Sequence, residues 1–332
     1  MAEIKQLAPE QLKAVTDGTE TPYIEFDESV LEELKAAGAD PEVLAPFVSK
    51  MPKEVQQGEQ VEILYYDIDT SAGGATGVID PYAYNALNSM AATTLKKKTL
   101  TWGGVGYSFS VPYIKRITNN WMDAIQTGII AATIQVWRDT EYLTFKGSGT
   151  AGQPLGLASQ IATTVAPSGT TGVPLTLDLI VSAYGTMYTD LGAPDMKLDG
   201  WLLLPPKIYQ NFLGTTLSGV TSVQYVVSQN EEKIVYAPRK VLELAWGTLE
   251  IIPTAQLAAT GTTIATLNQA WIIAKQVPYY GPNLKFYTFA SANPIVFRPP
   301  EDLIKSEVQI VYFFQPFLVQ PKGAVKIIGL TA

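Results

Sequence analysis

Histidine and cysteine are both absent from the 332 residues of the chain. Histidine is the usual general base near neutral pH and the commonest transition-metal ligand, and cysteine supplies thiolates and disulfides. Their absence excludes Ser-His-Asp triads, Cys-His dyads, ordinary zinc sites and disulfide bonds. Chemistry that uses only carboxylates remains open, either as glycoside hydrolysis or as a magnesium site.

Charge is also scarce. Charged residues make up 16% of the chain, compared with about 25% in typical soluble domains. A chain with so few charges has little with which to solvate its surface, which indicates that other copies of the chain cover part of it. The net charge of -8 argues against bulk binding of nucleic acid, because phosphates are bound by basic surfaces.

Long apolar runs are missing as well. No stretch approaches 18 consecutive apolar residues, so we expect no membrane span. The first 18 residues, MAEIKQLAPEQLKAVTDG, lack the apolar core of a secretion signal. Hydrophobic residues nevertheless make up 47% of the chain, so the sequence can form either one large domain or two moderate ones.

The N-terminal part predicts an arm followed by β-structure. Residues 27–38 predict a short helix that Asp27 caps and Gly38 ends, and Asp40-Pro41 predicts the start of a second one. Residues 61–69 predict a strand because they are β-branched and aromatic.

A second β-segment shows the clearest alternation in the chain. It places Val105, Tyr107, Phe109 and Val111 on one face and Gly104, Gly106, Ser108 and Ser110 on the other. We interpret it as part of a protruding hairpin.

The longest helical pattern begins at Asn119 or Asn120, either of which can cap it, and continues to about residue 146. Beyond it, Thr176 caps a helix whose predicted buried face is Leu177, Ile180, Tyr184 and Met187 and which Gly192 ends. A buried strand before Pro206, a helix from Pro206 and several β-segments follow. Without an alternating βαβ pattern, the fold class is α+β.

Gly147, Gly149 and Gly152 form the pattern G-x-G-x-x-G, which in dinucleotide-binding proteins follows a strand and opens a helix. Here the glycines follow the long helix and end it. We therefore interpret Gly147 as a left-handed helix cap and reject a nucleotide site.

The order of these features resembles the major capsid proteins of tailed bacteriophages, whose fold encapsulin shells share. The resemblance covers most of the chain. It depends on Asp139 near the end of the long helix, on the Gly147-x-Gly149 and Pro154-x-Gly156 segment, and on residues 175–191 and 199–213.

The resemblance implies an α+β capsid fold with an N-terminal arm, an extended β-hairpin loop, a spine helix, a peripheral domain and an axial domain. The implied ranges are 1–53 for the arm, 54–113 for the β-loop, 114–172 with 290–332 for the peripheral domain, and 173–289 for the axial domain.

In function, the resemblance implies a structural subunit that forms an icosahedral-type shell of hexamers and pentamers round a phage genome. Assembly would occur in the host cytoplasm, portal, scaffolding or decoration proteins are further candidate partners, and DNA is enclosed without specific binding. No catalytic residue, metal or cofactor is expected. The alternatives are an encapsulin-type compartment, which the long arm disfavours, and a carboxylate-based hydrolase.

Six residues are expected at subunit contacts: Lys96, Lys97, Lys98, Trp102, Tyr279 and Tyr280. The lysines fit either a contact with an acidic neighbour or a solvated edge that deters strand pairing. Aromatic residues are enriched at interfaces, although core packing is the simpler interpretation for each taken singly.

Asp67 and Asp69 share a strand face and could hold a hard cation, but two solvent-facing carboxylates are the simpler interpretation. Glu231-Glu232 and Glu301-Asp302 are ordinary acidic pairs.

Overall fold

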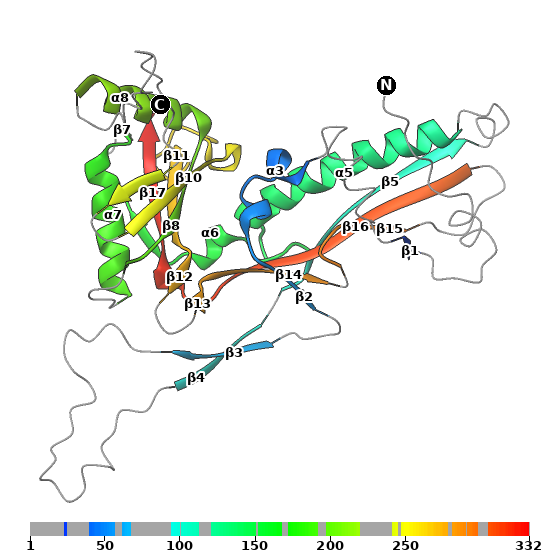
Figure 1. Cartoon of the computed structure of the whole chain (residues 1–332), viewed down its shortest axis with the longest axis horizontal. Coiled ribbons are helices and arrows are strands. Elements are labelled where there is room, and N and C mark those ends of the chain that lie inside the picture. The colour runs from blue at the N-terminus through cyan, green and yellow to red at the C-terminus, as the bar shows by residue number, and fades with distance from the viewer. Residues whose placement is uncertain are drawn as a thin grey trace, which may run out of the picture. The chain divides into compact units, whose positions relative to one another are not determined.

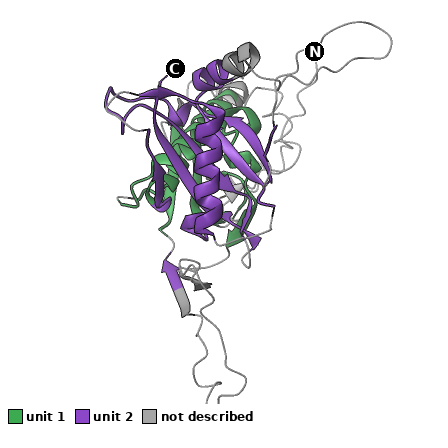
Figure 2. Ribbon diagram, turned by 90° about the vertical axis from the view of Figure 1, so that its left-hand side faces the viewer, with its two compact units in different colours: residues 1–60, 101–159, 285–317 green, residues 61–100, 160–284, 318–332 purple. Residues whose placement is uncertain are grey.

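The computed structural model describes part of the chain, which divides into two compact units (Figure 2). Unit 1 comprises residues 1–60, 101–159 and 285–317, and unit 2 comprises residues 61–100, 160–284 and 318–332. The described residues are 23–24, 40–56, 62–67, 94–99, 101–112, 121–150, 152–167, 172–191, 197–219, 241–244, 247–277, 281–289, 291–297 and 305–331.

Unit 1 combines one long helix with a six-stranded sheet. Its described elements are β1 (Tyr23–Ile24), α3 (Pro41–Leu44), the 3-10 helix η1 (Val48–Lys50), β2 (Lys53–Gln56), β5 (Gly103–Pro112), α5 (Trp121–Lys146), α6 (Leu157–Gln160), β14 (Leu284–Phe289), β15 (Ile295–Phe297) and β16 (Lys305–Leu318). The sheet order is β1-β15-β16-β14-β2, and β5 pairs with β16.

Helix α5 confirms the predicted spine helix, and it runs beside β5 and β16 (Figure 1). Its predicted capping asparagines lie outside the described residues. Val136 and Trp137 are both buried, and the Trp137 ring meets Tyr312 of β16 with 5.5 Å between ring centroids. Aromatic packing of this kind stabilises the contact beyond the area that it buries.

Strand β5 confirms the predicted alternation, since Val105 is buried while Gly104 and Gly106 are exposed. Its partner differs from the expectation of a protruding hairpin. β5 pairs antiparallel with β16 in a register that runs from Gly103–Phe314 to Pro112–Lys305. The apolar face of β5 lies on α5, where a Cβ added to Gly128 would come 2.4 Å from the Phe109 ring. Strand β5 is therefore part of the body of unit 1.

The short helix α3 begins as predicted, with Pro41 as its first residue. The Asp40 side chain accepts a hydrogen bond from the Glu42 N–H at 2.9 Å, which satisfies a donor that the helix cannot pair itself. The expected cap and stop of the earlier helix, Asp27 and Gly38, lie outside the described residues.

Unit 2 contains a seven-stranded mixed sheet and two further strand pairs. Its described elements are β3 (Glu62–Asp67), β4 (Thr94–Thr99), β6 (Thr163–Val165), β7 (Val173–Pro174), α7 (Leu177–Asp190), β8 (Gly200–Leu204), α8 (Pro206–Gly219), β9 (Val241–Leu244), β10 (Gly247–Pro253), the 3-10 helix η3 (Ala255–Leu257), β11 (Asn268–Ala274), β12 (Gln276–Val277), β13 (Gly281–Pro282), the 3-10 helix η4 (Pro321–Gly323) and β17 (Ala324–Thr331). The main sheet has the order β6-β17-β11-β8-β10-β9, and β7 pairs with β17.

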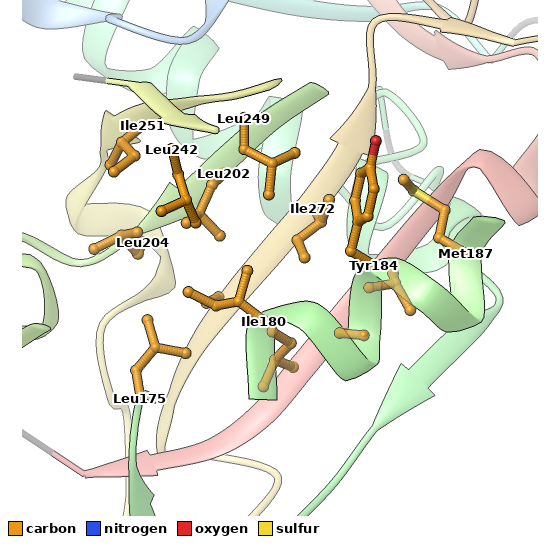
Figure 3. Close-up of a cluster of buried hydrophobic side chains, with 14 of the residues drawn as sticks. Leu175, Ile180, Tyr184, Met187, Leu202, Leu204, Leu242, Leu249, Ile251 and Ile272 are labelled. Atoms are coloured by element: carbon orange, nitrogen blue, oxygen red, sulfur yellow. The ribbon is translucent and has the colours of Figure 1, made fainter. Parts of the chain in front are cut away.

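Helix α7 packs on one face of this sheet, and the side chains between them form an apolar core. Side chains of α7 and of the strands point toward one another, among them Ile180, Tyr184, Leu202 and Ile272 (Figure 3). The Thr176 cap is confirmed, because its side chain accepts from the Leu179 N–H. The prediction for Leu177 was wrong, since this residue is 41% exposed; as the first residue of the helix it lies where the chain enters from the surface.

The C-terminal strands join different sheets. The sequence placed residues 308–330 together in the peripheral domain, whereas β16 pairs with strands of unit 1 and β17 pairs with β11 in unit 2. The alternation within each strand predicts its buried face but not which sheet it joins, because the partner strands are distant in sequence.

Candidate subunit interface

Three aromatic side chains of unit 1 form an exposed cluster, which we call the aromatic cluster: Trp102, Phe289 and Phe313. The rings of Trp102 and Phe289 are 5.9 Å apart and T-shaped, and those of Phe289 and Phe313 are 6.4 Å apart and also T-shaped. Phe289 is 38% exposed and Phe313 is 42% exposed, while Trp102 is half-buried. Adjacent exposed aromatic side chains from three segments are typical of a surface that another molecule covers.

Strand pairing explains why Phe313 lies at the surface. Its neighbours on β16, Tyr312 and Phe314, point to the opposite face, where both rings stack on Phe286. Phe313 lies opposite Gly104 of β5, and a Cβ at Gly104 would come 2.8 Å from the Phe313 ring. The glycine therefore allows the ring to lie across the neighbouring strand.

Sequence reasoning selected Trp102 but missed Phe289 and Phe313. The signal was the run Tyr312-Phe313-Phe314, since consecutive aromatic residues on a strand must place one ring on each face of the sheet. A strand such as β16, which is apolar on both faces, needs other apolar groups packed on both faces to shield it from water.

The lysine run lies on β4 of the antiparallel β3–β4 hairpin, where Lys97 is exposed. Lys98 is half-buried, and its Nζ donates to the Leu318 carbonyl at 3.2 Å and to Gln160 Oε1 at 3.4 Å. Burial lowers the pKa of Lys98 to about 8. The two hydrogen bonds of Lys98 therefore link this hairpin to residues 160 and 318 of unit 2, while burial disfavours its charge. The described backbone of Lys96 pairs with Tyr65.

Other candidate residues fall outside the description. Tyr279 and Tyr280 are not among the described residues, and neither are Asp69 or the acidic pairs Glu231-Glu232 and Glu301-Asp302. Asp67 is the last residue of β3. Within the described part, no group of three or more acidic side chains is placed to hold a metal ion.

The glycine segment after α5 is a tight structural connection. Ser148 and Leu155 form an antiparallel bridge, the Gly149 N–H donates to the Pro154 carbonyl at 3.1 Å, and the Gly156 N–H donates to the Gly147 carbonyl at 2.9 Å. The left-handed prediction for Gly147 was wrong, because the positive φ angles lie at Gly149 (74°) and Gly152 (78°).

Gly147 is required by close packing of the backbone. A Cβ at this position would lie 2.2 Å from the Pro154 carbonyl oxygen. The segment is also held against the sheet of unit 1, since Gln315 of β16 pairs through its amide with both the N–H and the carbonyl of Leu155, each at 3.1 Å. These backbone groups are thus used within the protein, which explains the glycines without a phosphate ligand.

Sequence reasoning also missed Glu141 of α5, which is buried and accepts hydrogen bonds from the backbone N–H groups of Phe47 and Val48. The signal was a lone acidic residue one turn after Trp137 and one turn before Phe145, on the apolar side of the predicted helix.

No protein-family model and no curated protein sequence matches the chain. Solved structures do match it along most of its length. A capsid chain of cyanophage A-1(L) superposes with a TM-score of 0.61 at 11% identity, covering 87% of this chain and 93% of that chain. The SrpI encapsulin of Synechococcus elongatus PCC 7942 gives a TM-score of 0.54 at 10% identity, covering 96% and 95% of the two chains.

The chain has the capsid fold. The capsid of a native GTA particle is a third similar structure, with a TM-score of 0.53 at 10% identity and coverage of 86% of this chain and 90% of that one. The predicted fold class, a mixed α+β capsid fold, is therefore confirmed. None of the helices in the described ranges is long and apolar enough to cross a membrane.

Proposed function

We propose that the chain is the structural subunit of an icosahedral-type shell, the major capsid protein of a tailed bacteriophage. The observation that carries this proposal is the capsid fold itself, matched over about nine-tenths of this chain and of a cyanophage capsid chain. A shell protein functions by assembly. Contacts between its subunits produce a closed container when the angles between neighbouring subunits allow the assembly to close on itself.

The aromatic cluster supports a function that requires other copies of the chain. Burial of Phe289 and Phe313 would remove apolar surface that a single subunit leaves in water. The net charge of -8 suits an inner wall from which packaged DNA must be released. We further propose that neighbouring subunits are contacted by Trp102, Lys96, Lys97, Tyr279 and Tyr280. The shell would be built from hexamers and pentamers of the chain.

The domain assignment is part of the same proposal. Unit 1 would be the peripheral domain and unit 2 the axial domain, with the residues before α3 as the arm and the β3–β4 hairpin as part of the extended loop. Because of the sheets that they join, β5 and β14 would belong to the peripheral domain, and β6 and β17 would belong to the axial domain. The protein would assemble in the host cytoplasm and remain in the virion as its capsid. Portal, scaffolding or decoration proteins would be its further partners.

An encapsulin-type compartment is the second candidate, because the SrpI encapsulin matches 96% of this chain, a larger share than the cyanophage capsid covers. The cargo distinguishes the two candidates. Purified particles that contain double-stranded DNA support the phage capsid, whereas particles that contain one enzyme species support the compartment.

Electron microscopy of the purified protein tests the proposal. We expect closed particles from the natural chain and none from the double variant Phe289→Ser and Phe313→Ser, which should remain folded by circular dichroism. The matched control is Tyr142→Ser, since Tyr142 is 47% exposed on α5 and lies outside the aromatic cluster. A natural chain that remains monomeric at high concentration contradicts the proposed shell.

A truncation tests the arm, and the structure locates where to cut. Ala45, Phe47 and Val48 are fully buried in unit 1, so removal of residues 1–50 would also damage the folded body. Removal of residues 1–39 spares them and takes from the described sheet only the two-residue edge strand β1. We expect this shorter truncation to prevent assembly and to leave the subunit folded; normal particles would contradict the role proposed for the arm.

A further inference from the structure

Glu141 is a buried acidic residue that holds a separate segment of the chain on α5. It is 2% exposed, and its carboxylate accepts from the Val48 N–H at 3.1 Å and from the Phe47 N–H at 3.4 Å. Val48 is the first residue of η1, and the capping position, Phe47, provides no side-chain cap of its own. Glu141 therefore satisfies N–H groups at a helix start from a different element.

Residues 45–51, which we call the junction segment, follow directly after α3. Apolar packing supplies the rest of their attachment, since Ala45, Phe47 and Val48 are fully buried and the Phe47 ring lies 5.5 Å from the Phe145 ring. The carboxylate of Glu141 is thus a charged group inside an otherwise apolar contact.

Two opposing effects act on Glu141. Burial penalises the ionised carboxylate, whereas the two N–H donors favour it. Burial is the larger effect and raises the pKa of Glu141 to about 7. The carboxylate therefore loses more on leaving water than the two hydrogen bonds return, and the attached segment is most stable when Glu141 is protonated.

The other charged groups near the junction segment are either exposed or already paired. Asp40 of α3 accepts from the Glu42 N–H, Lys53 of β2 lies over the Trp137 ring at 4.9 Å and Glu54 pairs with Lys285 at 3.1 Å. On α5, Asp139 accepts from the Tyr107 hydroxyl. The remaining charged side chains reach solvent: Glu42, Lys50, Arg138 and Lys146.

We propose that Glu141 is a pH-dependent latch that holds the junction segment on α5 at acidic pH and loosens it as the pH rises to neutral. When the segment is released, Glu141 meets water and regains an ordinary carboxylate affinity for protons. The N-terminal residues are held on unit 1 at two places, through β1, which pairs with β15, and through α3 and this segment, so the latch would control the second of these attachments.

The direction follows from proton linkage. The attached state binds the proton more tightly than the released state, so acid favours attachment. Between pH 4.5 and about 7, the two pKa values of Glu141, release becomes about tenfold easier with each pH unit, and above this range it no longer changes. From pH 5 to pH 8 the opening equilibrium should rise by about two orders of magnitude.

Hydrogen exchange measured by mass spectrometry on the full chain tests this proposal. After correction for the intrinsic pH dependence of exchange, we expect peptides over residues 45–51 to lose protection from pH 5 to pH 8. The internal control is residues 200–204 of β8, which are buried and contain no titratable side chain. Equal pH dependence in the two peptides would overturn the proposal, with no variant required.

Two matched variants locate the effect. Glu141→Gln keeps the shape and an acceptor oxygen without the charge, so protection of residues 45–51 should become independent of pH. Glu42→Gln removes an exposed carboxylate from α3 and should keep the pH dependence of the natural chain. A pH dependence that survives in the Glu141→Gln variant contradicts the latch. Because this readout concerns one subunit, it can fail while shells still form, and shells can fail while it holds.

Discussion

The two units bury their main helices in different ways. In unit 2, α7 presents Ile180, Ala183, Tyr184 and Met187 to an apolar core, and the Tyr184 hydroxyl donates to the Leu198 carbonyl. In unit 1, α5 buries Glu141 and three threonines whose hydroxyls have no hydrogen-bond partner in the described structure: Thr133, Thr140 and Thr144. The buried Tyr184 hydroxyl of α7 is thus paired, whereas the three threonine hydroxyls of α5 are not, although an unpaired buried hydroxyl lowers stability.

The described surfaces of the two units also differ, in the kind of hydrophobic side chain that they expose. Unit 1 exposes the paired aromatic rings of Phe289 and Phe313, in addition to Val43, Val55 and Tyr142, whereas the large hydrophobic residues exposed in unit 2 are Leu177 and Val241. Unit 2 thus completes its own core within one chain. Unit 1 combines a less optimised interior with an aromatic surface, which is the pattern expected where stability is completed by association.

The largest effect should come from the core of unit 2. Ile272→Ala removes a fully buried side chain beneath α7 and should lower the free energy of unfolding by about 4 kcal/mol. Phe313→Ala in unit 1 removes a larger side chain that is 42% exposed, and should change subunit stability by less than about 1 kcal/mol. Thermal or urea denaturation of unassembled subunits measures both. Equal losses would remove the distinction between the units.

The glycine segment of unit 1 should give the next largest effect. In Gly147→Ala the new Cβ would meet the Pro154 carbonyl oxygen at 2.2 Å, so the strain should cost about 3 kcal/mol. Gly152→Ala is the matched control, because its Cβ meets nothing within 4 Å and only its φ of 78° opposes the change, at a cost of about 1 kcal/mol. A reversed order in chemical denaturation would contradict the close approach of the Pro154 carbonyl to Gly147.

These glycines also show what sequence can predict. The residues that follow α5 predict the helix end correctly, because a helix boundary depends on neighbouring residues. They do not predict why Gly147 must be glycine, since Pro154 approaches it only after the chain has folded back. In the same way, alternation predicted the two faces of β5 but not its pairing with β16, and Trp102 was selected where Phe289 and Phe313 were missed. The local sequence pattern thus predicts helices and strands, whereas the packing around Gly147 and the aromatic cluster depend on residues that are distant in sequence.

The amide of Gln315 should matter less than Gly147 but remain measurable. Gln315→Leu leaves the N–H and the carbonyl of Leu155 without this partner, and should lower stability by about 2 kcal/mol. Gln309→Leu is the control on the same strand β16, since Gln309 is half-buried and donates only to the side chain of Glu307 among the contacts described. Differential scanning calorimetry of the two variants should separate them; equal melting temperatures would mean that Gln315 does not hold the segment.

The smallest effect tests the comparison most directly, because it should have opposite signs in the two units. Thr133 of α5 is 1% exposed and its hydroxyl is unpaired, so Thr133→Val replaces it with a methyl group of similar size and should stabilise unit 1 by up to about 1 kcal/mol. Thr254 of unit 2 is 3% exposed, but its hydroxyl accepts from the Gln256 N–H at 3.3 Å and caps η3. Thr254→Val should therefore destabilise by about 1 kcal/mol. Both variants keep a β-branched residue, so the difference between their urea midpoints reports the hydroxyl group alone. A loss of stability in Thr133→Val would mean that the buried face of α5 pairs its polar groups as fully as unit 2 does.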